Sequence, residues 1–158
     1  MSLETVYYVG QTVAVVAILV SLAFVGIQIR QNTRATRAAA HHAITDSFNA
    51  INSIIGTNPE AARIFRLGLE SLANLNEDEQ MSFAYLCLAN MRILETLYYQ
   101  KHIGTMEAQL FEAERRSIVW VAKGAGFRDW WRSNDISLSD EYRAYVDEII
   151  VEAEKASG

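Results

Sequence analysis

The N-terminal segment constrains the fold most, because no charged residue occurs from Thr5 to Ile29. The segment is rich in Val, Ile, Leu and Phe, and it exceeds the roughly 20 apolar residues that a helix needs to cross a ~30 Å hydrocarbon layer. Each such residue near the helix centre favours insertion by roughly 0.3 to 0.6 kcal/mol, so isolated polar groups such as Gln11 and Ser21 do not cancel the total. The sequence therefore predicts a transmembrane anchor over residues 1–29.

Two other interpretations of this segment fit the sequence less well. A cleaved signal peptide has a basic start and a small-residue cleavage site, whereas here only Glu4 precedes the apolar run and Ile27 to Arg30 end it. A core helix of a soluble domain has a polar face, but Ser21 is the only polar residue between Val13 and Ile27. We therefore expect an uncleaved, single-pass membrane helix.

The flanking charges predict the direction in which this helix crosses the membrane. Arg30, Arg34 and Arg37 follow the span, while the segment before it contains Glu4 and neither Lys nor Arg. Because Lys and Arg are enriched on the cytoplasmic side, the N-terminus is expected outside and the remainder of the chain in the cytoplasm. The three arginines are also expected to contact lipid headgroups, at on the order of 1 kcal/mol each.

One face of the span carries small residues, which are Gly10, Ala14, Ala17 and Ser21 at spacings of four, three and four. Small side chains at this period let two helices approach closely, so this face is a candidate for helix packing in the membrane. The alternative is that Gly and Ala are simply common in membrane helices. Besides the lipid bilayer, the expected partners are therefore a membrane-protein complex or a second copy of the chain.

Residues 30–158 have the periodicity of an all-α cytoplasmic domain. The first helix is expected to continue past the span, since Gln31 to Ala43 contains neither Pro nor Gly. Cap and stop signals predict further helices over 59–72, 76–103, 105–123 and 139–153. The segment from Phe127 to Arg132 is expected to be too brief for a full amphipathic helix. The predicted fold is an N-terminal transmembrane helix that continues into a small cytoplasmic helical bundle.

Two aspects of the bundle core follow from side-chain patterns. An apolar stripe at helical spacing, formed by Ile44, Phe48, Ile51 and Ile55, is expected to pack against the rest of the domain. The adjacent aromatic residues Trp130-Trp131 are flanked by arginines, so they are candidates for a partner-docking surface, although at least one of them is expected in the core.

The helix predicted over 76–103 carries the best candidate for a ligand-binding site. Arg92, Glu95, Tyr99 and His102 recur at spacings of three, four and three, and they form a polar stripe on an otherwise apolar element. A pocket around these groups would make the protein a small-ligand sensor or an enzyme. The structural alternative, which we prefer, is a buried ion pair with tyrosine and histidine partners.

Other kinds of chemistry have little support in the sequence. A net charge of -5 argues against nucleic acid as a partner. The single cysteine, Cys87, is expected to be a buried thiol and excludes an intrachain disulfide. His42 and Asp46, next to His41, supply too few ligands for a metal site, and no motif for a cofactor, a nucleophile or a phosphate occurs. We therefore expect no metal, no cofactor and no catalytic residue, and an enzyme is the less favoured interpretation.

Four segments carry a resemblance to a known family, namely Gln28 to Ala35, Tyr98 to Gln100, Trp130-Trp131 and Tyr142 to Asp147. On these residues the chain resembles a family of small bacterial proteins, without an assigned activity, that have one N-terminal transmembrane helix and a helical cytoplasmic domain. The resemblance covers most of the chain. It implies this architecture and a location in the bacterial inner (cytoplasmic) membrane, and it implies no catalytic role.

The leading functional hypothesis is therefore a membrane-anchored accessory or scaffold protein that binds a membrane complex or self-associates. It follows from an anchor joined to a domain in which no catalytic motif is visible. A small-ligand sensor or enzyme that uses the polar stripe of the helix predicted over 76–103 is the alternative.

Overall fold

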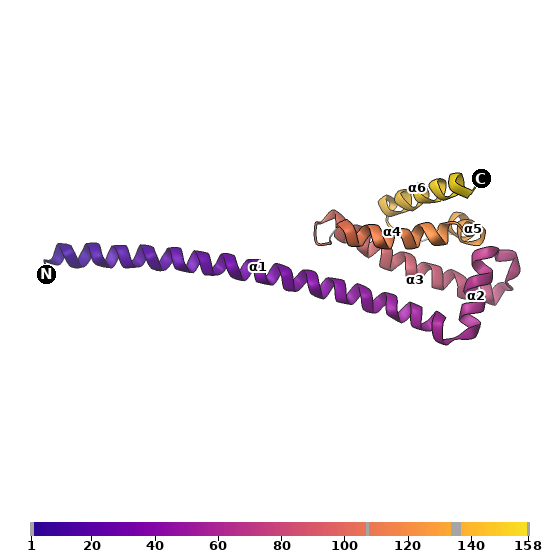
Figure 1. Ribbon diagram of the computed structural model, residues 1–158, viewed down its shortest axis with the longest axis horizontal. Helices are drawn as coiled ribbons and strands as arrows, with labels where there is room; N and C mark the ends of the chain where they lie inside the picture. The colour runs from indigo at the N-terminus through magenta and orange to yellow at the C-terminus, as the bar shows by residue number, and fades with distance from the viewer. Residues whose placement is uncertain (1, 107, 134–136, 158) are drawn as a thin grey trace. The chain divides into compact units, whose positions relative to one another are not determined.

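A computed structural model describes residues 2–106, 108–133 and 137–157, and all regular secondary structure in this part of the chain is helical. The predicted all-α class is therefore confirmed. In chain order (Figure 1) the elements are α1 (Leu3–Thr57), α2 (Pro59–Glu70), the short 3-10 helix η1 (Leu72–Asn74), α3 (Glu77–His102), α4 (Ala108–Ala122), α5 (Ala125–Ser133) and α6 (Asp140–Ser157). The helices predicted over 59–72, 76–103, 105–123 and 139–153 correspond to α2, α3, α4 and α6.

The chain divides into two compact units, residues 1–40 and residues 41–158, and the division falls inside α1. The sequence placed the boundary at residues 29 and 30, where the apolar run ends. Residues 30–39 are all exposed, and the first buried side chain of α1 is Ile44. The end of the apolar run and the start of tertiary packing therefore lie at different residues of one helix.

In the first unit, the apolar side chains of α1 have no cover. Every residue from 2 to 39 is exposed, and among the described residues α1 is the one helix that is long and apolar enough to span a membrane. The hydroxyls of Thr12 and Ser21 donate to the carbonyls of Tyr8 and Ala17, at 2.9 and 2.8 Å. These polar groups are thus satisfied within their own helix, as a hydrocarbon environment requires.

In the second unit, an asparagine caps the start of both α2 and α3. Asn58 caps α2, and Asn76 begins α3 with a capping box. The Asn76 side chain accepts the Glu79 N–H at 3.0 Å, and the Glu79 carboxylate accepts the Asn76 N–H at 2.9 Å. The bond from Asn76 N–H, together with the Arg63 guanidinium, holds the pKa of the Glu79 carboxyl below its usual value.

Helix α5 differs from the prediction. Residues Ala125–Ser133 form an amphipathic helix of nine residues, so the expectation that Phe127 to Arg132 is too brief for a full amphipathic helix is wrong. Phe127, Trp130 and Trp131 are 1 to 3% exposed, at the spacing of three and four that one helical face requires. Tertiary burial of this aromatic face therefore stabilises a helix that is too short to be predicted from local sequence signals.

Helices α2 and α5 approach each other closely at two glycines. A Cβ atom on Gly126 of α5 would collide with the carbonyl oxygen of Gly68 in α2. A Cβ atom on Gly68 would in turn collide with the ring of Phe83 in α3. The absence of side chains at these two positions therefore sets the spacing of three helices.

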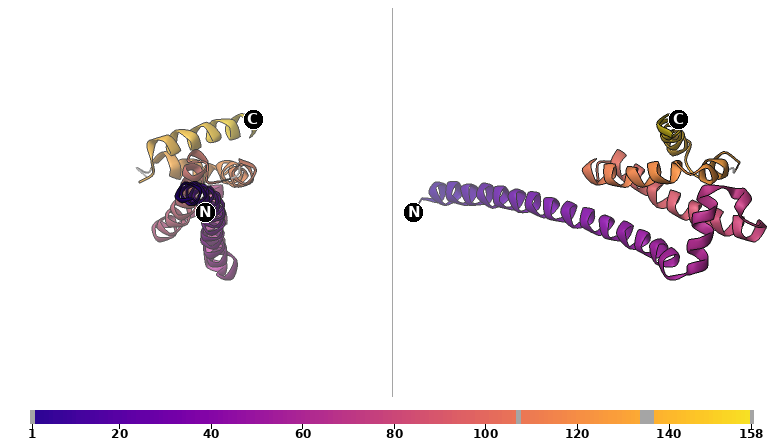
Figure 2. Two further views of the ribbon diagram at one scale, coloured as in Figure 1. Left: turned by 90° about the vertical axis from the view of Figure 1, so that its left-hand side faces the viewer. Right: turned by 45° about the vertical axis from the view of Figure 1, so that its right-hand side comes forward.

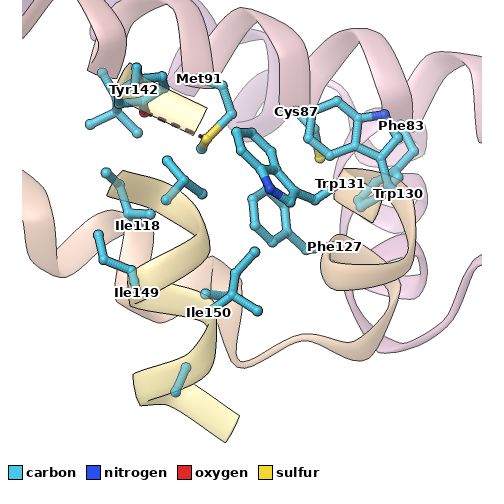
Figure 3. Close-up of a cluster of buried hydrophobic side chains, with 14 of the residues drawn as sticks. Phe83, Cys87, Met91, Ile118, Phe127, Trp130, Trp131, Tyr142, Ile149 and Ile150 are labelled. Atoms are coloured by element: carbon cyan, nitrogen blue, oxygen red, sulfur yellow. Dashed lines mark hydrogen bonds between the residues drawn. The ribbon is translucent and has the colours of Figure 1, made fainter. Parts of the chain in front are cut away.

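The core of the second unit is formed largely by α3, α4, α5 and α6, of which α4 and α6 lie side by side (Figures 1 and 2). Figure 3 shows Trp131, Phe83 and Met91 in this core, each at most 1% exposed. The Tyr142 hydroxyl donates to the Met91 sulfur at 3.8 Å. Trp130 and Trp131 are thus both core residues, so the expectation that at least one of them lies in the core is confirmed and the docking-surface interpretation is wrong.

The part of α1 that belongs to the second unit packs by the predicted apolar stripe. Ile44 and Ile51 are each 7% exposed, and Phe48 and Ile55 are half-buried. Ile44 belongs to the hydrophobic core of the bundle and Phe48 packs against it, while Asn49 and Asn52 of the same helix remain exposed.

Candidate functional site

The predicted polar stripe lies on α3, and three of its four side chains are exposed. Arg92, Tyr99 and His102 are exposed, with Tyr99 at 63%, whereas Glu95 is half-buried. The Glu95 carboxylate accepts the N–H of Ser139 at 2.6 Å, at the residue just before α6. The expected buried ion pair between Arg92 and Glu95 is wrong, because Arg92 faces solvent. A ligand-binding role for the stripe stays a prediction.

An aromatic cluster occupies the inward side of the same stretch of α3. Tyr98, not its neighbour Tyr99, packs against Tyr142 and Tyr145, with ring centroids 5.6 and 4.9 Å apart. The Nδ1 atom of His102 lies 2.9 Å from the Tyr98 carbonyl oxygen. Burial raises the pKa of the Tyr142 and Tyr145 hydroxyls, so both stay neutral at physiological pH. The arrangement is that of packed core tyrosines.

The residues predicted to act at the membrane all lie in the first unit. The small residues Gly10, Ala14, Ala17 and Ser21 are exposed, and apart from the neighbouring backbone of α1 no heavy atom of the described residues lies within 4 Å of a Cβ built on Gly10. The three arginines at 30, 34 and 37 are exposed as well. This placement is compatible with helix packing and headgroup contact, and both roles stay predictions.

A cleft that was not predicted from the sequence lies in the second unit, between residues 45–55 of α1 and helices α3 and α4. Its volume is about 530 Å³, which is within the range of small-molecule sites. The apolar part of its lining comes from five helices and consists of Phe48, Ile55, Phe65, Cys87, Met91, Leu94, Trp120, Val121 and Phe127. The polar part consists of Thr45, Asn49, Asn52, Asn90, Arg116 and Ser117.

The deep part of this cleft is apolar and chemically inert. Cys87, Met91, Leu94 and Phe127 are 1 to 4% exposed, and Figure 3 shows three of them in the buried cluster. Burial raises the pKa of the Cys87 thiol far above its usual value, so the sulfur stays protonated and is a poor nucleophile. The expected buried thiol is thus confirmed, and the cleft is better suited to binding than to covalent catalysis.

The mouth of the cleft is polar and carries one cation. Asn49, Asn52 and Arg116 are exposed, and Trp120 is 61% exposed one helical turn after Arg116 on α4. Among the described residues, no Asp or Glu lines the cleft, and Arg116 is its only charged residue. In a chain of net charge -5 the cleft is therefore locally positive.

Sequence reasoning missed this site because no single helix carries it. The sequence signals that could have indicated the cleft are pairs of residues at helical spacing. Asn49 and Asn52 are three residues apart on α1. On α4, Arg116 and Trp120 are four residues apart. A tryptophan on the polar face of an amphipathic helix is the more informative of these signals, because large aromatic side chains are usually buried.

Comparison of the chain with protein-family models, with curated proteins and with solved structures found no match. Within the described residues, no three His, Cys, Asp or Glu side chains gather into a group that could hold a metal ion. The cleft and the bare apolar part of α1 are therefore the two features from which function is inferred.

Proposed function

We propose that the chain is a membrane-anchored accessory protein, in which residues 1–29 hold the span and the helical unit is presented in the cytoplasm. One observation carries the proposal, namely that the apolar side chains in residues 2–39 of α1 are exposed on all sides of the helix. Ile18, Leu19, Val20 and Leu22 point in different directions around the helix, yet each is 59 to 64% exposed. In water, such a surface would far exceed the apolar patches that soluble proteins tolerate.

The apolar surface also favours a lipid environment over pairing in water. A helix that pairs in a coiled coil is apolar along one narrow stripe and polar elsewhere. Between Val13 and Ile27 the only polar side chain is Ser21, and its hydroxyl is bonded within the helix. Hydrocarbon is the solvent in which all sides of this segment are stable.

The proposed orientation rests on charge. The arginines at 30, 34 and 37 follow the apolar run and lie exposed on α1, where anionic headgroups of the inner leaflet would attract them. This places the N-terminus outside and residues 41–158 in the cytoplasm. The family resemblance adds the bacterial inner membrane as the location.

The proposed accessory role is contact with a second membrane helix, in a complex or in another copy of this chain. The alternative, a sensor or enzyme that uses Arg92, Glu95, Tyr99 and His102, has less support because three of these side chains lie open on the surface of α3. A membrane helix with a small-residue face fits the accessory role better.

Disulfide crosslinking within the membrane tests the accessory role. Single cysteines at positions 10, 14, 17 and 21 are compared with matched cysteines at 12, 16, 19 and 23, which lie on the opposite face of the same helix. The native Cys87 is buried and does not interfere. We expect crosslinks, to a second copy or to a partner, on the small-residue face only. Equal crosslinking of both faces, or a strictly monomeric protein without a reproducible partner, would contradict the proposal.

A further inference from the structure

We propose that the cleft between residues 45–55 of α1 and helices α3 and α4 binds a single-chain amphiphile with an anionic headgroup. The apolar chain would occupy the buried floor, and the headgroup would lie at the mouth against Arg116. This site is independent of the membrane-helix contacts, and no motif in the sequence indicates it.

The floor of the cleft fits an apolar chain. Its deep side chains are Cys87, Met91, Leu94 and Phe127, and none of them presents a charge or a strong hydrogen-bonding group. Met91 is unbranched and polarisable, so it adapts to a flexible chain. A volume of about 530 Å³ suits a ligand that buries most of its surface.

The charge at the mouth selects the sign of the headgroup. Arg116 is the only charged residue of the lining, so a cationic headgroup would be repelled and would find no carboxylate among the described lining residues. A guanidinium binds a carboxylate or a phosphate through two parallel hydrogen bonds. Asn49 and Asn52 lie at the same mouth, and their amides can donate further hydrogen bonds.

A comparison with the neighbouring Arg115 shows that the Arg116 guanidinium is available to bind a headgroup. Arg115 forms an ion pair with Glu152 of α6 at 2.7 Å and so helps to hold α4 and α6 together. Within the described part of the chain, no carboxylate forms such a pair with Arg116. The two adjacent arginines on α4 thus have different roles. Arg115 links α4 to α6, whereas Arg116 faces the cleft.

The test uses the full chain in nanodiscs of zwitterionic phosphatidylcholine at pH 8, free of detergent. The probe is 11-bromoundecanoate, whose bromine quenches tryptophan fluorescence at short range, and Trp120 at the mouth is the reporter. We expect saturable quenching, beyond that of the Trp120→Phe variant. Competition by undecanoate and by dodecyl phosphate then distinguishes a carboxylate from a phosphate headgroup, and displacement by either supports the proposal.

Two matched variants make the outcome decisive. Arg116→Gln is expected to weaken binding of the probe at least tenfold, whereas Arg115→Gln, which removes the same charge one position away, should change it less than twofold. The thermal transition of Arg116→Gln should be unchanged, since its side chain is exposed. Absence of saturable quenching, equal effects of the two variants, or displacement by undecanol as effective as by undecanoate would each overturn the proposal.

Discussion

Replacing Gly126 with alanine is expected to destabilise the helical unit by about 3 kcal/mol or more, the upper part of the range for overpacked cores. The added Cβ atom would collide with the Gly68 carbonyl oxygen, which is backbone and cannot rotate away. Relief requires α5 to move off α2, and this would disturb the packing of Trp130 and Trp131, which project from α5. Thermal unfolding of the full chain in micelles, followed by tryptophan fluorescence, should show a Tm lowered by about 10 °C.

Gly56 supplies the matched control for this substitution. It lies in the last turn of α1, and apart from the neighbouring backbone of α1 no heavy atom of the described residues lies within 4 Å of a Cβ built there. Gly56→Ala should leave the Tm unchanged or raise it slightly, because alanine is the better helix former. A Gly126→Ala protein with the Tm of the parent chain would show that the glycine contact does not set the spacing of α2 and α5.

Trp131→Ala is the second substitution with a large expected effect, about 3 to 5 kcal/mol of lost stability. The ring is 1% exposed and packs against Phe127 with centroids 6.1 Å apart. Its Nε1–H donates to the Asp147 carboxylate at 2.7 Å and so links α5 to α6. Alanine would leave a large cavity and remove this bond. Chemical unfolding monitored by circular dichroism measures the loss and does not depend on the deleted fluorophore.

Trp120→Ala is the corresponding control, since it removes the same side chain from an exposed position. Trp120 is 61% exposed at the mouth of the cleft. Its replacement should change stability by less than about 1 kcal/mol, as is usual at surface positions. If the two alanine variants lost equal stability, the assignment of Trp131 to the centre of the core would be contradicted.

The features that could be predicted from the sequence depend on neighbouring residues. The capping box of Asn76 and Glu79 is contained within three positions, and both members are favoured there by short-range chemistry. The uncharged run from Thr5 to Ile29 and the apolar stripe from Ile44 to Ile55 are likewise visible as periodicity or its absence. Each of these patterns can be recognised in the sequence without knowledge of the fold.

The features that could not be predicted depend on residues that are distant in sequence. Helix α5 is short and begins with two small residues, and its stability derives from the contact of Gly126 with Gly68 of α2 and from the burial of its aromatic face. The cleft draws its lining from five helices, so no local pattern contains it. The polar stripe on α3 follows the helical period, but periodicity does not show whether the polar face of a helix lines a cavity or lies in solvent.

The central claim, a single span with the helical unit in the cytoplasm, is tested most directly by cysteine labelling in spheroplasts of a bacterial host. Leu3→Cys and Lys155→Cys place a reactive thiol near each end of the chain, at exposed positions. The native Cys87 is buried and its thiol pKa is raised, so it does not react. We predict that a membrane-impermeant maleimide labels Leu3→Cys in intact spheroplasts and Lys155→Cys only after permeabilisation. Labelling of Lys155→Cys in intact spheroplasts, or protection of Leu3→Cys, would contradict the proposed topology.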